Sequence, residues 1–237
     1  MLSSLLSHPK SASVELLNNI QQQLNSVVLG KPDIVKLCLC STLARGHLLI
    51  EDYPGVGKTT LAQAMATVLG LEFNRIQFTS DMLPADVVGV SIYDAAEKIF
   101  EFNPGPIFSS VVLADEINRA TPKAQSALLE AMEERQVSVD GVSHELPEPF
   151  FVIATQNPHD QSGTFALPES QLDRFMMTVS IGYPGAEFEL ALLRSGDRRQ
   201  MLKELKPSTN AQGVIKLQEL ASQIHISKSL SQYVLNL

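Results

Sequence analysis

The stretch of residues 47–60 constrains the fold more than any other part of the chain. An apolar segment there leads into a turn that contains Gly55 and Gly57, and a helical pattern begins at Lys58 and Thr59. Glycines permit backbone conformations in which successive N–H groups turn inward, and the positive end of a following helix dipole points at the same anion. The stretch therefore predicts a phosphate-binding loop between a strand and a helix.

The loop matches the general phosphate-loop consensus G-x-x-x-x-G-K-[ST] at all but one position. Gly57, Lys58 and Thr59 fit it, whereas Asp52 stands where the first glycine is expected. The strand before and the helix after supply the required context, so we interpret the loop as a nucleotide site in which Lys58 reaches the phosphates and Thr59 coordinates Mg²⁺. The predicted cofactor-binding residues are Asp52, Tyr53, Pro54, Gly55, Val56, Gly57, Lys58, Thr59 and Thr60.

A second motif follows at residues 111–116, where four apolar residues precede Asp115 and Glu116. A continuous apolar run is typical of a strand buried on both faces of a parallel sheet, and ligands bind at the carboxyl edge of such sheets. Phosphoryl transfer needs charge neutralisation and a positioned nucleophile. We expect Asp115 to hold Mg²⁺ and Glu116 to orient and activate the attacking water. A strand that ends in solvated carboxylates is the alternative.

Another apolar run, residues 150–155, ends at Gln156 and Asn157. An amide at the tip of a strand beside the two acids would hold the attacking water or sense the γ-phosphate, so we expect Asn157 to belong to the site. The alternative is a turn that begins with Asn-Pro. Earlier in the chain, two helical patterns precede the first strand and predict a wall for an adenine ring around residues 28–30.

The rest of the chain predicts inserted hairpins and a helical end. Alternating segments at residues 90–93 and 99–102 predict one hairpin, and residues 136–146 predict another. An insertion of this kind often acts on a partner, although a surface excursion without a role fits equally well. The run Gly182-Tyr183-Pro184-Gly185 is a strong boundary signal. It divides a core at residues 1–182 from a helical region at residues 183–237.

Composition limits the classes of function. The net charge of −8 argues against non-specific nucleic-acid binding, which needs a basic surface. Cys38 and Cys40 lie two residues apart in a helical pattern, where they face different ways, so we predict neither a disulfide nor a metal clip and expect a reducing, cytoplasmic setting. No apolar run approaches the length of about 18 residues that a membrane span needs.

Several blocks in the same order resemble the MoxR family of AAA+ ATPases, over nearly the whole chain after about Val27. The loop of this family is similar to E-D-x-P-G-x-G-K-T, so Asp52 fits it. The blocks that carry the resemblance are EDYPGVGKT at 51–59, ADEINRA at 114–120, QSALLEAMEE at 125–134, ATQNP at 154–158 and LDRF at 172–175.

The resemblance implies the fold and the role of each site residue. The fold is an α/β AAA+ P-loop NTPase core, a five-stranded parallel sheet with flanking helices, followed by a helical lid that is incomplete because the chain ends before the sensor 2 motif. The implied roles are Lys58 and Thr59 as the Walker A residues, Asp115 and Glu116 as Walker B, Asn157 as sensor 1 and Arg174 as the arginine finger offered to a neighbouring subunit. Pairing of Arg174 with Asp173 is the alternative.

The function that the resemblance implies is Mg²⁺-dependent ATP hydrolysis in a homo-oligomeric ring, with a hexamer expected. Such a ring remodels client proteins in a chaperone-like role, often beside a partner with a von Willebrand factor A domain. Two other hypotheses stay open. One is a nucleotide-gated interaction module with little hydrolysis, and the other is a nucleic-acid motor on the same core, which the acidic composition disfavours.

Overall fold

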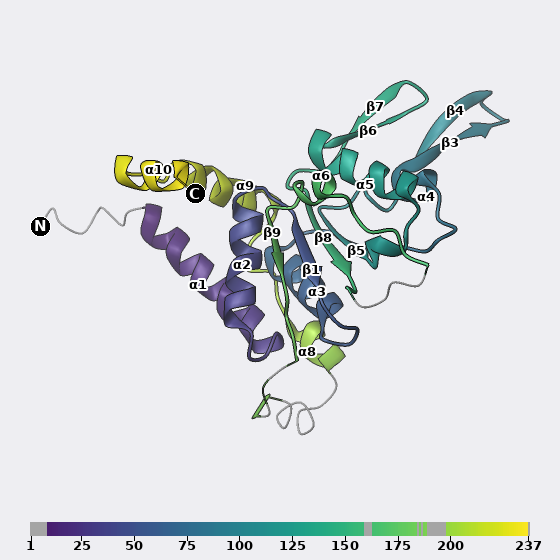
Figure 1. Cartoon of the computed structure of the whole chain (residues 1–237). Coiled ribbons are helices and arrows are strands. Elements are labelled where there is room, and N and C mark those ends of the chain that lie inside the picture. Colours follow the sequence, from purple (N-terminus) through teal and green to yellow (C-terminus); the bar gives the residue numbers. More distant parts are fainter. Residues whose placement is uncertain (1–8, 159–162, 184, 186, 189–197, 237) are drawn as a thin grey trace, which may run out of the picture.

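The computed structural model describes residues 9–158, 163–183, 185, 187–188 and 198–236, and a five-stranded sheet lies at its centre (Figure 1). The strand order is β2-β5-β8-β1-β9, and every neighbouring pair is parallel. This confirms the predicted α/β fold with a five-stranded parallel sheet. The strands are β1 (Leu48–Glu51), β2 (Phe73–Gln77), β5 (Val111–Asp115), β8 (Phe151–Gln156) and β9 (Met177–Val179).

The three central strands are buried on both faces because their apolar residues feed two separate cores. In β5, Val111 and Leu113 enter one core while Val112 and Ala114 enter the other. Successive side chains of a strand point to opposite faces, so a continuous apolar run supplies both cores at once. The pattern at 111–114 is thus explained by a layer of helices on each side of the sheet.

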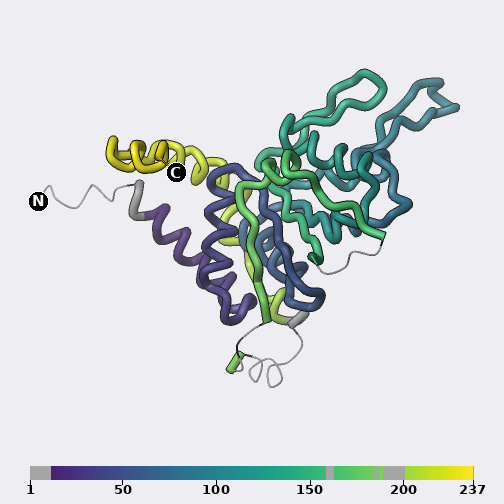
Figure 2. Tube along the Cα trace, in the orientation of Figure 1, coloured from purple at the N-terminus to yellow at the C-terminus, as the bar shows by residue number. Residues whose placement is uncertain are grey.

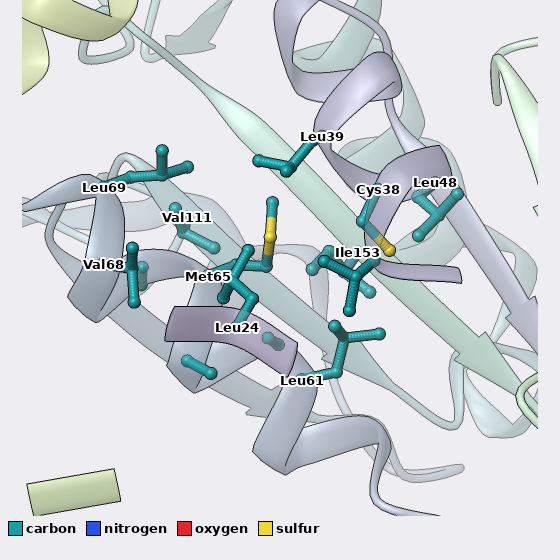
Figure 3. Close-up of a cluster of buried hydrophobic side chains, with 14 of the residues drawn as sticks. Leu24, Cys38, Leu39, Leu48, Leu61, Met65, Val68, Leu69, Val111 and Ile153 are labelled. Atoms are coloured by element: carbon teal, nitrogen blue, oxygen red, sulfur yellow. The ribbon is translucent and has the colours of Figure 1, made fainter. Parts of the chain in front are cut away.

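One face is covered by helices from both ends of the chain. Figure 3 shows Met65 of α3 close to Leu24 of α1, with Ile153 of β8 and Cys38 of α2 nearby. Helices α8 and α9 complete this face through partly buried Met201 and fully buried Val214. The helices of this face are α1 (Pro9–Val27), α2 (Pro32–Leu43), α3 (Lys58–Leu69), α8 (Arg198–Glu204) and α9 (Ala211–Ser222).

The opposite face is covered by α5 (Pro122–Glu134) and by the short helix α4 (Pro84–Val88). The Thr121 hydroxyl accepts a hydrogen bond from the Ala124 N–H and caps α5, as its sequence indicates. The sequence pattern did not reveal α4. Its start is held by the Asp86 carboxylate, which accepts a hydrogen bond from the Leu83 N–H.

Two antiparallel hairpins project side by side from one end of the core (Figures 1 and 2). Both were expected from the sequence. Their strands are β3 (Gly89–Asp94) with β4 (Ile99–Pro104), and β6 (Gln136–Val139) with β7 (Val142–Glu145). The rings of Phe102 and His144 stack with centroids 3.8 Å apart, so the two hairpins contact each other.

Of the described helices after β9, α8 and α9 pack on the core. The Gln218 side chain of α9 donates a hydrogen bond to the Thr42 carbonyl of α2 at 2.8 Å. Pro184 and residues 189–197 lie outside the described residues, so the division at 182/183 and the incomplete lid stay predictions. The remaining helices are α6 (Glu169–Leu172), the 3₁₀ turn η1 (Ile117–Arg119) and α10 (Lys228–Leu235). Across the described ranges, no helix has the length and apolarity needed to cross a membrane.

His47, just before β1, contacts the neighbouring strand β8 and the helix α5. The residue is 6% exposed. Its Nδ1 accepts a hydrogen bond from the Val152 N–H at 3.0 Å, and its Nε2 lies 3.2 Å from the Met132 carbonyl oxygen. A neutral ring with its proton on Nε2 satisfies both contacts. Burial lowers the pKa of His47 from 6.5 to about 4, against the smaller opposing effect of the Met132 carbonyl.

We expect the free energy of unfolding to fall by up to about 3 kcal/mol between pH 6.5 and pH 4 through His47 alone. The native state keeps this ring neutral down to a pH of about 4, whereas the unfolded chain takes up a proton below pH 6.5. Protonation therefore stabilises the unfolded chain, and the folded protein loses stability as the pH falls from 6.5 towards 4. His47→Gln should show a shallower loss of stability than the wild type between pH 7 and pH 5, measured by urea unfolding. Exposed His225, replaced by Gln, is the control. Equal slopes in wild type and His47→Gln would contradict the assignment.

Candidate functional site

The carboxyl ends of β1, β5 and β8 meet at one edge of the sheet and open into a cavity of about 570 Å³. The parallel register pairs Ile50 with Thr155 and Ala114 with Ala154, so the segments that follow these strands emerge together. The cavity is lined by Pro54, Gly55, Gly57, Lys58, Thr59, Thr60, Arg75, Gln77, Asp115, Glu116, Arg119 and Asn157.

The loop before α3 depends on two glycines in the left-handed region. Gly55 has φ of 85° and Gly57 has φ of 96°, and α3 begins directly after Gly57. Nothing lies within 4 Å of a Cβ built on Gly55, so the requirement at that position is conformational rather than steric. The loop and the first turn of α3 thus form one wall of the cavity.

Lys58 crosses this loop. Its ammonium donates to the Asp52 carbonyl at 2.8 Å and to the Tyr53 carbonyl at 3.3 Å. Desolvation lowers the pKa of Lys58, and the nearby carboxylates of Asp115, Asp52 and Glu116 oppose that shift. The cation therefore lies between the loop and the two acids at the carboxyl end of β5, Asp115 and Glu116.

Asp52 faces away from the cavity. Its carboxylate accepts hydrogen bonds from the Gly182 N–H at 2.6 Å, the Tyr53 N–H at 2.8 Å and the Ser180 hydroxyl at 3.2 Å. Burial raises the pKa of this carboxyl, but the hydrogen bonds outweigh burial and hold the pKa below its usual value. Asp52, which stands where the general consensus has its first glycine, thus ties the loop to the segment that follows β9. That Asp52 contacts a nucleotide stays a prediction.

Asp115 and Glu116 are linked through a buried hydroxyl that sequence reasoning missed. Thr155 of β8 donates to Asp115 Oδ1 at 2.5 Å and accepts from the Glu116 N–H at 3.0 Å. Glu116 has φ of 58°, a left-handed conformation that is uncommon for a residue with a side chain. The Thr155 hydroxyl therefore holds the backbone turn that separates the two carboxylates.

Three further side chains of the cavity also escaped sequence reasoning. Arg75 binds Asp115 Oδ2 through Nη2 at 2.6 Å and Nε at 3.1 Å. Glu116 Oε2 accepts from Gln77 Nε2 at 3.0 Å and pairs with Arg119 Nε at 3.1 Å. A signal for two of them exists in the sequence, because Arg75 and Gln77 alternate along β2 and so share one face of that strand.

The cavity brings together Lys58, Thr59, Asp115, Glu116 and Asn157, as predicted. Arg174 does not line it. Its guanidinium pairs with Glu133 of α5 at 2.9 Å rather than with Asp173, the partner considered from the sequence.

A smaller pocket adjoins the cavity and shares Gly57 and Thr60 with it. It is lined by Val28 and Leu29, where the sequence predicted a wall for an adenine ring, and by Val56 and Ile181.

The side chains that line the cavity fit Mg²⁺ and a nucleoside triphosphate. A threonine hydroxyl, Thr59, and a carboxylate, Asp115, face the same cavity, and hard oxygen donors are the ligands that Mg²⁺ prefers. Phosphate oxygens usually complete such a shell. The glycine loop, the start of α3 and Lys58 supply the complementary positive wall.

Comparison with known proteins identifies relatives over most of the chain. Residues 47–177 match the family model described as "ATPase family associated with various cellular activities (AAA)". YeaC of Bacillus subtilis, a protein of uncharacterised function, is 48% identical over 222 residues, which is 94% of this chain and 69% of that protein. Chaperone MoxR1 of Mycobacterium tuberculosis is 39% identical over 94% of this chain and 59% of its own length.

A solved structure supports the same relationship. The crystal structure of a presumed ATPase from Cytophaga hutchinsonii superposes with a TM-score of 0.86 at 36% identity, covering 95% of this chain and 68% of that one. Protein MoxR of Paracoccus denitrificans is 34% identical over 90% of this chain and 66% of its own length. The chain thus spans between 59% and 69% of the length of these relatives. Because the family model covers more than half of its residues and its relatives include proteins named MoxR, the chain belongs to the MoxR family of AAA+ ATPases.

Proposed function

We propose that the strand-end cavity binds Mg²⁺-ATP and hydrolyses it. The observation that carries this proposal is the Thr155 hydroxyl, which fixes Asp115 and Glu116 next to each other opposite Lys58 and the glycine loop. Phosphoryl transfer depends on positioning and charge stabilisation, and this arrangement supplies both.

Each residue then has a distinct task. The loop N–H groups and Lys58 bind the phosphates, and the smaller pocket beside Val28 takes the base. Thr59 and Asp115 would hold Mg²⁺, which would supply neutralisation of phosphate charge. Glu116 orients the attacking water and accepts its proton, with Asn157 beside it at the end of β8.

We also propose that catalysis requires assembly into a ring, with a hexamer as the expected form. Arg174 supports this, because its guanidinium lies outside its own subunit's cavity and its side chain is 34% exposed. An arginine placed there can reach the γ-phosphate of a neighbouring subunit, and such fingers accelerate hydrolysis by about 10³–10⁵. Assembly with a von Willebrand factor A domain protein is part of the same proposal.

Two free cysteines, Cys38 and Cys40, fit a cytoplasmic location.

The two hairpins supply a surface for a client polypeptide. Between them lies a groove of about 520 Å³, lined by Phe100 and Phe102 on one hairpin and Val139, Val142 and His144 on the other. Its apolar lining is exposed, since Phe100 is 72% and Val142 is 56% accessible. Isolated exposed apolar residues are normal, but a grouped patch beside a groove marks an interaction site.

The charged side chains of the two hairpins indicate which kind of client would bind there. Within residues 89–104 and 136–145, the acidic side chains are Asp94, Glu97, Glu101, Asp140 and Glu145, and the only lysine or arginine is Lys98. An apolar groove with an acidic rim complements a basic, apolar segment of a polypeptide and repels phosphate backbones. We therefore propose client proteins as the target and disfavour a nucleic-acid motor.

Hydrolysis at shared subunit interfaces is tested by the ATPase rate against protein concentration. Wild-type turnover should rise with concentration, and Glu116→Gln should lose at least about 100-fold because the water loses its base. An equal mixture of Glu116→Gln and Arg174→Ala should hydrolyse ATP faster than either pure sample, because the intact cavity of an Arg174→Ala subunit meets Arg174 of a Glu116→Gln neighbour. A rate near zero in every sample, together with measurable ATP binding, would contradict the ATP-hydrolysing ring and favour the nucleotide-gated interaction module.

Client binding is tested with fluorescent peptides that differ only in charge, Lys/Leu against Glu/Leu. The Lys peptide should bind tighter, and Phe100→Ser should weaken it by about fivefold or more because an exposed aromatic anchor is lost. Glu101→Lys should weaken the Lys peptide and strengthen the Glu peptide, with Tyr233→Ser of distant α10 as the matched surface control. Equal affinity for both peptides, or tighter binding of single-stranded DNA, would contradict the assignment.

A further inference from the structure

Arg75 is a cation held against the carboxylate that is assigned to Mg²⁺. Both oxygens of Asp115 already accept hydrogen bonds, Oδ1 from the Thr155 hydroxyl and Oδ2 from two nitrogens of the Arg75 guanidinium. A carboxylate offers about four acceptor positions, and three of those on Asp115 are occupied. The charge of Asp115 is therefore already paired within the chain.

The same guanidinium also reaches the second acid. Arg75 Nη2 donates to the Gln77 side-chain oxygen, and the amide nitrogen of Gln77 donates to Glu116 at 3.0 Å. Arg75 thus restrains Asp115 directly and Glu116 through Gln77. All four side chains line the cavity that holds the glycine loop.

The physical conflict is between two cations on one carboxylate. A Mg²⁺ ion that coordinates Asp115 withdraws charge from both of its oxygens and repels the guanidinium bound to Oδ2. Asp115 is pinned because its side chain is 11% exposed, whereas the Arg75 side chain is 46% exposed and has room to move. The arginine is the partner that gives way.

We infer that Arg75 competes with Mg²⁺ for Asp115, so that metal binding requires Arg75 to release the carboxylate. This inference rests on the proposed function of the cavity and adds a regulatory element to it. Arg75 is a positioning residue here, because it acts through Asp115 and Gln77. The competition raises the Mg²⁺ concentration at which the site becomes loaded.

The test measures binding, not turnover. A fluorescent, non-hydrolysable ATP analogue is titrated with MgCl₂ in wild type and in Arg75→Gln. The magnesium midpoint should fall by about fivefold in Arg75→Gln, the size expected for loss of a partly exposed ion pair. Arg75→Lys keeps a competing cation and should stay within about twofold of wild type. Arg135→Gln is the matched control and should leave the midpoint unchanged, since Arg135 pairs with Glu148 and does not line this cavity.

A measurement on the wild type keeps the inference testable if Arg75→Gln does not fold. The NMR signal of the Arg75 Nε–H should move when Mg²⁺ and the analogue are added together, and stay in place when the analogue is added with EDTA. A stationary signal in both cases would overturn the inference.

The outcomes separate this inference from the proposed function. A midpoint in Arg75→Gln that equals or exceeds that of wild type would overturn the competition while leaving the nucleotide site intact. Absence of analogue binding by the wild type would instead overturn the proposed function itself.

Discussion

The parallel pairing of β5 between β2 and β8 is the constraint on which the rest of the site depends. It requires a strand whose every residue is buried, and Val111 to Ala114 satisfy this with side chains for both cores. Because all neighbouring strands run the same way, their carboxyl ends deliver the glycine loop, the acids and Asn157 to one edge. The groups needed for the chemistry come from separate segments of the chain, and the parallel sheet brings them together at this edge.

Buried polar contacts then fix the geometry at that edge. The Thr155 hydroxyl sets the turn between Asp115 and Glu116, and the Asp52 carboxylate fastens the loop to Gly182. Such contacts are worth most where water is excluded, because an unpaired polar group there is costly. The left-handed backbone of Glu116 is consistent with strain that the surrounding structure maintains at a functional position.

The parts of the fold and of the site that the sequence predicted are those whose residues lie close together in the chain. The loop and the acids were found because their motifs lie within short segments flanked by a strand and a helix, and the sheet followed from apolar runs. Arg75 and Gln77 were missed because their role depends on β2 lying next to β5, which strand order decides. The contact from Asp52 to Gly182 spans 130 residues, and Arg174, in the turn after α6, pairs with Glu133 of α5. No spacing rule reaches such pairs.

Every role proposed for this edge of the sheet requires nucleotide binding. The most direct measurement is therefore the affinity for ATP, in the presence of Mg²⁺, of the wild type compared with Lys58→Ala. Since Lys58 lies between the loop and the acids, we predict saturable binding by the wild type, a thermal midpoint that rises with ATP, and at least about tenfold weaker binding by the variant. Equal affinity in the two proteins, or no binding by the wild type, would contradict the account.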